Sequence, residues 1–242
     1  MKTWSIRVGT LVLVTLALAA CARHPAQTAS QSQQQTADAA TSSAAAIPAK
    51  WVEGKNYTSL VPAQPTSVAS DKVEVLELFW YGSDRCFRLD PVLEGWRKQG
   101  KPAFVEFERV PVMSNSATRA HARLFYTLEA LGKLELLHTA VFREIHVNNG
   151  YFLDINPATA ERLQQAFLKA NGVSEENFDR AYGSSSVERK LQRAEQLTRA
   201  YNVTDVPLIV VNGKYTADTD TAGGEKELLE LVDDLATSER KR

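Results

Sequence analysis

The stretch VEVLELFWYGSDRCFRLDPVLEGW, from Val73 to Trp96, carries the strongest structural signal in the sequence. Its first part, Val73–Tyr81, is apolar nearly throughout and rich in β-branched and aromatic residues, which is typical of a strand buried on both faces. Gly82 then opens a turn, and a helix kinked at Pro91 is predicted to follow to about Lys98. A buried strand that runs into a helix predicts an α/β fold.

The rest of the folded part alternates in the same way. Phe104–Val112 predicts a second strand, and residues 116–182 predict a block of helices because their leucines recur at helical spacing. The remaining predicted elements are a helix over 185–201, a strand over Pro207–Val211, a hairpin turn at Asn212-Gly213, a partner strand from Lys214, and a last helix with Leu228, Leu231, Val232 and Leu235 inward. Asn156 and Ser174 are predicted helix caps.

Composition excludes several classes of function. The chain has 242 residues, with 28 Lys and Arg against 29 Asp and Glu, so its net charge of −1 gives no electrostatic reason to bind nucleic acid. Two cysteines cannot form a disulfide scaffold or a four-cysteine zinc site. His121, His138 and His146 lack the spacing of metal ligands, and no glycine-rich phosphate loop is present. We therefore expect neither a metal nor a cofactor.

The N-terminus is predicted to direct export and to anchor the chain. Lys2 and Arg7 precede an apolar run over residues 8–20, which suits a signal peptide and falls short of the roughly 20 residues of a membrane-spanning helix. The run ends in Leu18-Ala-Ala-Cys21, which resembles the bacterial lipobox. This resemblance implies that residues 1–20 are removed and that Cys21 is diacylated, so that lipid anchors the protein to a membrane of the cell envelope.

Residues 22–49 are rich in Gln, Ala, Ser and Thr and almost uncharged. Such a segment buries too little apolar surface to offset its chain entropy, so residues 21–49 are predicted to be a lipidated cysteine followed by a flexible linker. Ala22 stands where an Asp is the usual inner-membrane retention signal of enteric bacteria, which favours the outer membrane. The folded domain is then expected in the periplasm.

Two motifs resemble the DsbA family of periplasmic thiol:disulfide oxidoreductases. The segment ELFWYGSDRCFRLDPVLEGW (Glu77–Trp96) is similar to the family's active-site strand, its Cys-Pro-His-Cys turn and the following helix. The segment NVTDVPLIVVNGKY (Asn202–Tyr215) is similar to its second signature, a Val before a cis-proline followed by a strand and a hairpin, and GKNYTSL (Gly54–Leu60) resembles its opening strand. The resemblance implies a thioredoxin fold over residues 50–113 and 184–242, with a helical insertion over 114–183.

The active-site motif departs from that of the family. It stands here as Ser83-Asp84-Arg85-Cys86, so Ser83 occupies the position of the first, nucleophilic cysteine and Cys86 that of its resolving partner. A lipidated Cys21 is a thioether and cannot pair with Cys86. Disulfide donation needs two sulfurs, and a serine hydroxyl does not ionise near neutral pH, so the dithiol cycle is expected to be lost. Whether the chain is an enzyme at all stays open.

The residues of this turn allow two interpretations each. Ser83 is a favourable N-cap and Asp84 complements the helix dipole, so both have a structural explanation beside the functional one. Cys86 is either an inert buried side chain or a thiolate, favoured by the helix N-terminus and Arg85, that forms mixed disulfides. The second interpretation requires an accessible sulfur.

Three further residues acquire roles from the resemblance. Val206 precedes Pro207, which is expected to be cis, and in this fold the backbone at that position pairs with an extended client peptide. Glu77 stands in the buried strand where the family has an acidic group that tunes the thiol. Its usual lysine partner on the next strand is expected to be absent, because Phe107 and Glu108 occupy that place. A strand carboxylate with other partners is the alternative for Glu77.

Three functions follow as hypotheses. The first is a DsbA-like envelope lipoprotein that acts on exported proteins, with interchange lost or reduced to monothiol exchange at Cys86, where a small thiol or a redox protein is a further partner. The second is a thiol-independent, chaperone-like module that binds peptides beside Pro207. The third is a glutathione-binding enzyme, because kappa-class glutathione transferases share this fold and place a serine at the position of Ser83; export argues against a cytosolic thiol cofactor.

Overall fold

The computed structural model describes residues 45–148, 150 and 156–240. The chain divides into two units, residues 1–40 and 41–242, and every described residue belongs to the second unit. The predicted signal peptide, Cys21 and most of the predicted linker lie outside the described residues. None of the helices within the described residues combines the length and the apolar character that crossing a membrane requires.

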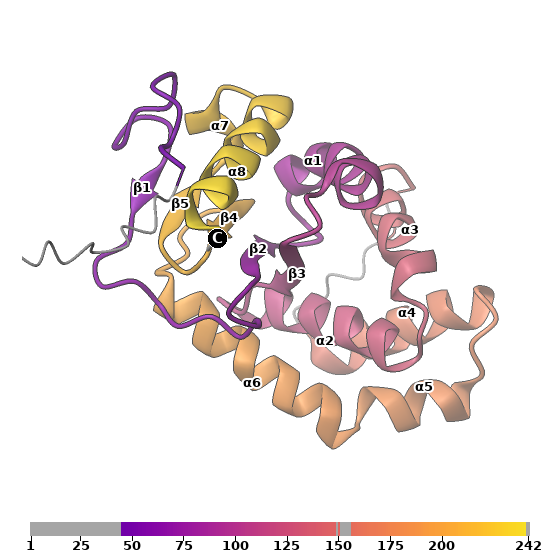
Figure 1. The fold of residues 1–242 in the computed structure, drawn as a ribbon. Coiled ribbons are helices and arrows are strands. Elements are labelled where there is room, and N and C mark those ends of the chain that lie inside the picture. The colour runs from indigo at the N-terminus through magenta and orange to yellow at the C-terminus, as the bar shows by residue number, and fades with distance from the viewer. Residues whose placement is uncertain (1–44, 149, 151–155, 241–242) are drawn as a thin grey trace, which may run out of the picture. The chain divides into compact units, whose positions relative to one another are not determined.

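A five-stranded sheet organises the described residues (Figure 1). Its strands are β1 (Thr58–Ser59), β2 (Val73–Phe79), β3 (Val105–Pro111), β4 (Leu208–Val211) and β5 (Tyr215–Ala217), in the spatial order β1-β5-β4-β2-β3. Strands β2 and β3 are parallel, and the other pairs are antiparallel. All seven residues of β2 are buried, as the apolar run in the sequence predicts. The turn that follows β2 is therefore attached to a fully buried strand.

One face of the sheet is covered by α1 (Asp84–Gly95) and α8 (Glu225–Glu239). Helix α1 continues through Pro91 and passes into a π-helical turn, Trp96–Gly100. A short helix, α7 (Thr219–Ala222), precedes α8. The buried side chains on this face form one apolar cluster, which includes Val75, Leu93, Ile209 and Leu231.

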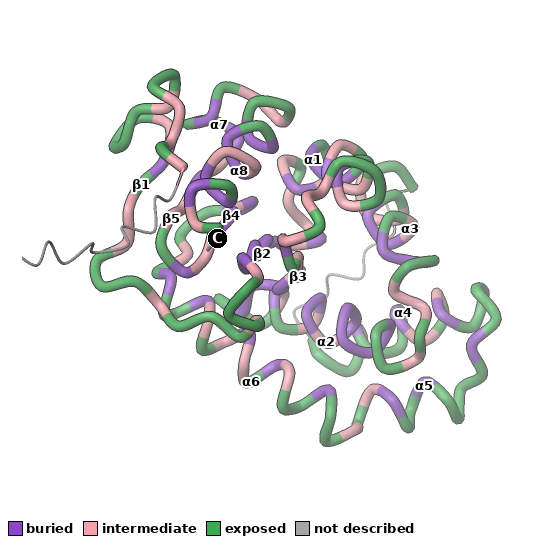
Figure 2. The backbone as a smooth tube through the Cα atoms, viewed as in Figure 1, coloured by how far each residue is buried: buried purple, intermediate pink, exposed green. Residues whose placement is uncertain are grey.

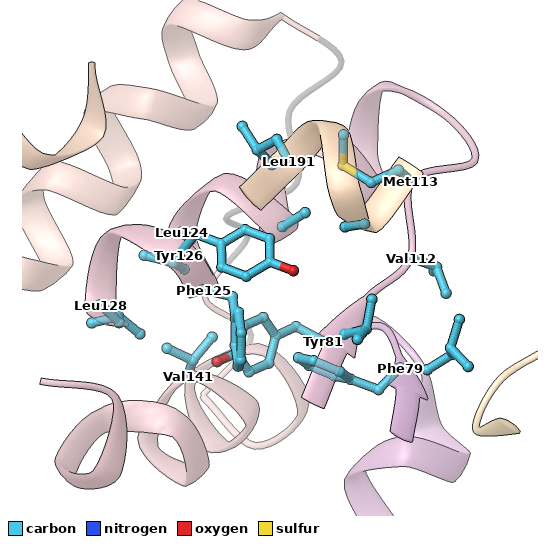
Figure 3. Packing of buried hydrophobic residues seen from close by; sticks show 14 of the residues in the cluster. Phe79, Tyr81, Val112, Met113, Leu124, Phe125, Tyr126, Leu128, Val141 and Leu191 are labelled. Atoms are coloured by element: carbon cyan, nitrogen blue, oxygen red, sulfur yellow. The ribbon is translucent and has the colours of Figure 1, made fainter. Parts of the chain in front are cut away.

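The opposite face packs against α2 (Ser116–Ala130) and α6 (Ser185–Ala200). Three more helices, α3 (Leu134–His146), α4 (Pro157–Ala170) and α5 (Glu175–Tyr182), lie around α2 (Figure 1). Figure 2 shows the alternation of buried and exposed residues along these helices, which is the helical spacing read from the sequence. Figure 3 shows aromatic side chains from β2 and α2, Phe79 and Phe125, meeting in this core, where their ring centroids lie 5.3 Å apart.

Helix caps set the start of several helices. The side chains of Asn156 and Ser174 accept hydrogen bonds from the first turns of α4 and α5, which confirms both predicted caps. Ser83 caps α1 in the same way. The hairpin between β4 and β5 contains Gly213 at φ 64°, where a Cβ would lie 2.1 Å from the carbonyl oxygen of Gln64, so only glycine fits there.

Candidate functional site

The turn between β2 and α1 presents Ser83 just beyond the carboxyl end of β2, which lies between β4 and β3 in the sheet. The Ser83 hydroxyl accepts a hydrogen bond from the Cys86 N–H at 3.3 Å, and the Ser83 N–H donates to the Trp80 carbonyl at 3.0 Å. A Cβ at Gly82 would lie 2.4 Å from the Trp80 ring, so glycine at this position lets the ring lie against the turn. The local geometry is that of an N-capped helix, as one of the two interpretations of Ser83 predicts.

The structure brings the two sequence motifs together. The Val206–Pro207 peptide bond is cis, as expected. The Ser83 hydroxyl donates a hydrogen bond to the Val206 carbonyl at 3.2 Å, so the turn and the cis-proline loop are in direct contact although the two residues are 123 positions apart.

Cys86 is fully buried, with no part of its surface exposed. Burial raises the pKa of its thiol to about 12, and the nearby Glu77 carboxylate acts in the same direction. Hydrogen bonds from the turn and the charge of Arg85 lower this pKa by less. The buried sulfur favours an inert side chain over an accessible thiolate at Cys86, because α1 turns the residue inward together with Leu89 and Leu93.

The Arg85 side chain forms ion pairs with carboxylates and not with the Cys86 thiol. Its guanidinium forms ion pairs with Asp205, in the loop before the cis-proline, and with Asp220 in α7. The two aspartates raise the pKa of Arg85, so the group stays charged at all ordinary pH values. Arg85 thus ties the start of α1 to two other segments.

Glu77 does have a cationic partner on the neighbouring strand. The register of β2 and β3 places Glu77 opposite Arg109, whose Nε lies 3.0 Å from Glu77 Oε2. This partner is an arginine and not the lysine of the family. The assumption that Phe107 and Glu108 lie opposite Glu77 is wrong, because they pair with Val75 and Leu76. Burial raises the pKa of Glu77 to about 7, although Arg109 lowers it.

Arg109 is shared among several carboxylates under α1. Its Nη2 lies 2.8 Å from Glu94 and 3.6 Å from Asp90, and its own side chain is only 8% exposed. Burial alone would raise the pKa of Glu94, but the cations around it, Arg97 first, lower it. The inner face of α1 is therefore partly ionic.

Sequence reasoning missed a cluster around Tyr81. The Tyr81 hydroxyl shares a hydrogen bond of 2.8 Å with His138 Nδ1, and His138 Nε2 lies 3.3 Å from Asp90 Oδ1. His146 Nε2 donates to the Tyr81 carbonyl at 2.7 Å, and its Nδ1 lies 3.0 Å from Asp84. No fixed spacing in the sequence marks these contacts, because they join α3 to the end of β2 and to α1.

His121 is the third histidine among the described residues, beside His138 and His146. Among the side chains of the described residues, no group of three or more His, Cys, Asp or Glu is placed to bind a metal ion. His121 is buried beside Tyr81, with both ring nitrogens lacking a hydrogen-bond partner in the described structure. Burial lowers the pKa of its ring to about 3, so it is neutral.

Two pockets border the cis-proline loop. One, of about 240 Å³, is lined on its apolar side by Trp80, Val112, Val203 and Val206. The other, of about 400 Å³, is lined by Arg85, Asp205, Pro207 and Asp220 among others. Successive side chains of an extended peptide at Val206 would point to opposite sides of its own backbone.

Comparisons with known proteins agree with this arrangement. A family model described as DSBA-like thioredoxin domain matches residues 93–236. The thiol:disulfide interchange protein DsbA of Azotobacter vinelandii is 39% identical over 194 residues, which cover 80% of this chain and 86% of that protein. The protein of the same name from Pseudomonas aeruginosa is 38% identical over 190 residues, with 78% and 86% covered.

Solved structures show the same fold. The crystal structure of Pseudomonas aeruginosa DsbA matches with a TM-score of 0.69 and 36% identity, covering 76% of this chain and 92% of that one. The oxidoreductase DsbA from Xylella fastidiosa matches with a TM-score of 0.70 and 26% identity, covering 81% and 99%. The predicted α/β thioredoxin fold with a helical insertion is confirmed.

Proposed function

Because the chain belongs to the DSBA-like thioredoxin family of thiol:disulfide interchange proteins, we propose that it binds extended segments of exported proteins beside Val206 without running a dithiol cycle. The observation that carries this proposal is the contact between Ser83 and Val206. It places a hydroxyl, and not a thiol, where the turn meets the cis-proline loop. A hydroxyl forms no disulfide, whereas the loop retains its shape.

The burial of Cys86 supports the loss of interchange over a monothiol role. A thiol attacks a disulfide only as an accessible thiolate, and Cys86 is neither exposed nor acidic, with its pKa raised by burial to about 12. A mixed disulfide at Cys86 requires the start of α1 to open. We therefore favour the thiol-independent function over exchange at Cys86.

The two pockets support peptide binding. A client strand that pairs with the main chain of Val206 places alternate side chains on opposite sides of its own backbone. An apolar side chain fits the pocket lined by Trp80, Val112 and Val203, whose surface is mostly carbon. The second pocket, with Asp205 and Asp220, suits polar side chains.

The test uses a blocked, uncharged and cysteine-free peptide, acetyl-GSVTVSG-amide, with the full chain carrying Cys21→Ser. We expect the peptide to shift the backbone amide NMR signals of Ser83 and Val206 and to leave that of Gly172, in the α4–α5 connection, unchanged. The matched control is acetyl-GSPTPSG-amide, in which proline removes the N–H groups of the two valine positions and so opposes strand pairing. Equal shifts with both peptides, or none with either, contradict the proposal.

We also propose that the protein is anchored by lipid at Cys21 on the periplasmic side of the envelope, with the outer membrane favoured by Ala22. The lipobox resemblance of Leu18-Ala-Ala-Cys21 supports this, and these residues lie outside the described ones. Cys21→Ser is expected to move the protein from the membrane fraction to the soluble envelope fraction. A soluble wild type, or a variant that stays in the membrane fraction, contradicts the anchor.

A further inference from the structure

The main chain of Val206 is already engaged in the described structure. Its N–H donates to Asp205 Oδ1 at 2.8 Å, and its carbonyl accepts from the Ser83 hydroxyl at 3.2 Å. These are the same two groups that a client strand would use in the proposed function. The carbonyl oxygen has two lone pairs, so it can accept a second hydrogen bond from a client while it is bound to Ser83. The N–H can donate only once, so it is not available to a client while it is bound to Asp205. Asp205 therefore closes the only donor that Val206 offers.

Arg85 holds the Asp205 carboxylate in this position. Its guanidinium pairs with Asp205 and also with Asp220, and its own side chain is only 25% exposed. Hydrogen bonding to Arg85 lowers the pKa of Asp205, so the carboxyl group is ionised at neutral pH. A carboxylate oxygen on a backbone N–H takes the place that the carbonyl oxygen of a paired strand would occupy.

We propose that Asp205 is an internal competitor for the client site, held on the Val206 N–H by Arg85, and that a client strand pairs with Val206 only after Asp205 has turned away. This inference rests on the proposed function and adds to it a means of regulation. The competitor and the ligand are alike in chemistry, because each presents one oxygen acceptor to the same donor.

The contact between Asp205 and the Val206 N–H is weak enough for a client to displace. The Asp205 side chain is 73% exposed and that of Asp220 is 71% exposed, so water screens both ion pairs with Arg85. Exposed ion pairs of this kind contribute little, and Asp205 regains its hydration when it turns outward. A client that offers only one hydrogen bond gains nothing from the exchange, whereas one that also fills the pocket beside Trp80 does. The contact thus selects for extended clients with a suitable side chain.

The chain offers a matched pair of variants. Asp205→Ala and Asp220→Ala each remove one carboxylate from Arg85 and change the net charge equally. In the part of the chain that the structure describes, only Asp205 contacts the Val206 N–H. We expect Asp205→Ala to bind acetyl-GSVTVSG-amide about three- to tenfold more tightly than wild type, the size of one backbone hydrogen bond. Asp220→Ala, which leaves Asp205 on the Val206 N–H, is expected to show no such gain in affinity. Asp205→Asn keeps an oxygen acceptor and is expected to stay near wild type.

Amide hydrogen exchange of the free protein tests the contact without any client. The Val206 amide is expected to be protected in wild type and Asp220→Ala and to exchange at least tenfold faster in Asp205→Ala. Equal exchange or equal affinity in the two alanine variants overturns the proposal, because charge alone would then explain the effect. Protection that follows the expected pattern, with no peptide binding to any variant, overturns the proposed function instead.

Discussion

The Ser83 hydroxyl donates a hydrogen bond to the Val206 carbonyl at 3.2 Å, which joins the turn after β2 to the loop before β4. One side-chain oxygen thus caps α1 and contacts the cis-proline loop at the same time. Any atom placed at this position meets both a helix N-terminus and the proposed client backbone. The chemistry of the site can therefore be tested by exchanging that single atom.

Ser83→Cys is expected to restore a disulfide and measurable interchange activity. Residues 83 and 86 are three positions apart on the first turn of α1, within reach of a disulfide. The helix N-terminus favours a thiolate at position 83, whereas the charge of Asp84 opposes it, so the activity should be modest. Intact mass under oxidising buffer and dithiothreitol-driven insulin reduction measure the two effects.

Ser184→Cys is the control for that experiment, because Ser184 caps α6 in the same manner without a cysteine on the next turn. It should form no internal disulfide and leave insulin unreduced, as should wild type. Robust turnover by wild type contradicts the loss of family chemistry. A Ser83→Cys variant that forms no disulfide shows that the turn is unsuited to the bond.

Cys86 is expected to resist alkylation in the native protein. Its thiol is buried and burial raises its pKa to about 12, so at pH 8 few molecules carry a thiolate and none presents it to reagent. Iodoacetamide labelling, followed by mass, should require denaturant, and Cys86→Ala should lower the free energy of unfolding by about 1 kcal/mol. Ser83→Cys labels faster in its reduced form and serves as the accessible comparison. Rapid labelling of native wild type argues for a monothiol role.

His121 is expected to make the protein sensitive to acid. Burial lowers the pKa of its ring to about 3 in the folded state, below the unfolded value of about 6.5. Its contribution to stability is complete above pH 6.5 and is lost as the pH falls toward 3. At pH 4.5 the loss is about 2–3 kcal/mol, from about 1.4 kcal/mol per pH unit. His121→Phe should remove it, as measured by urea unfolding at pH 7 and pH 4.5.

Glu77 acts in the opposite direction, because its pKa is raised to about 7 and its contribution falls as the pH rises. Wild type and His121→Phe both contain Glu77 and His138. The difference in the pH dependence of their free energies of unfolding therefore reports on His121 alone. The same pH dependence in both proteins contradicts a buried neutral imidazole at this position.

Arg109→Met is expected to lower the free energy of unfolding by about 3–5 kcal/mol near neutral pH, because it leaves buried carboxylates without their cation. Glu77 is 2% exposed and pairs with Arg109 at 3.0 Å. Arg97→Met is the control, since Arg97 also pairs with Glu94 but is 22% exposed, and it should cost less than about 1 kcal/mol. Adding Glu77→Gln to Arg109→Met should recover part of the loss. Equal losses in the two arginine variants refute the difference in burial as the cause.

The sequence was sufficient for the elements and insufficient for the contacts between them. The apolar run of β2 predicts a strand buried on both faces, and the caps at Asn156 and Ser174 predict where α4 and α5 begin. These signals are local, so they survive without knowledge of the fold. The cis-proline and its contact with the turn were expected only from the family resemblance.

The wrong prediction concerns the register of two strands, and the missed contacts depend on how separate helices pack together. The partner of Glu77 depends on how β2 and β3 align, and an offset of one or two residues exchanges Arg109 for a neighbour. The histidines of α2 and α3 meet Tyr81 only because both helices pack on the same strand end. The burial of Cys86 did have a sequence signal, since it shares its helical spacing with Leu89 and Leu93.

The ionic contacts under α1 fix a position that apolar contacts leave free. Apolar burial has no preferred direction, so an apolar face can be buried at more than one position of a helix along a sheet. Arg109 meets Glu77 and Glu94 at 3.0 and 2.8 Å, and a shift of α1 by one turn would separate Arg109 from Glu94 inside the protein. The position of α1 along β3 is therefore fixed by contacts near the C-terminal end of the helix, at Glu94. The first turn of the helix, and Ser83 with it, is thereby held in alignment with the loop at Val206.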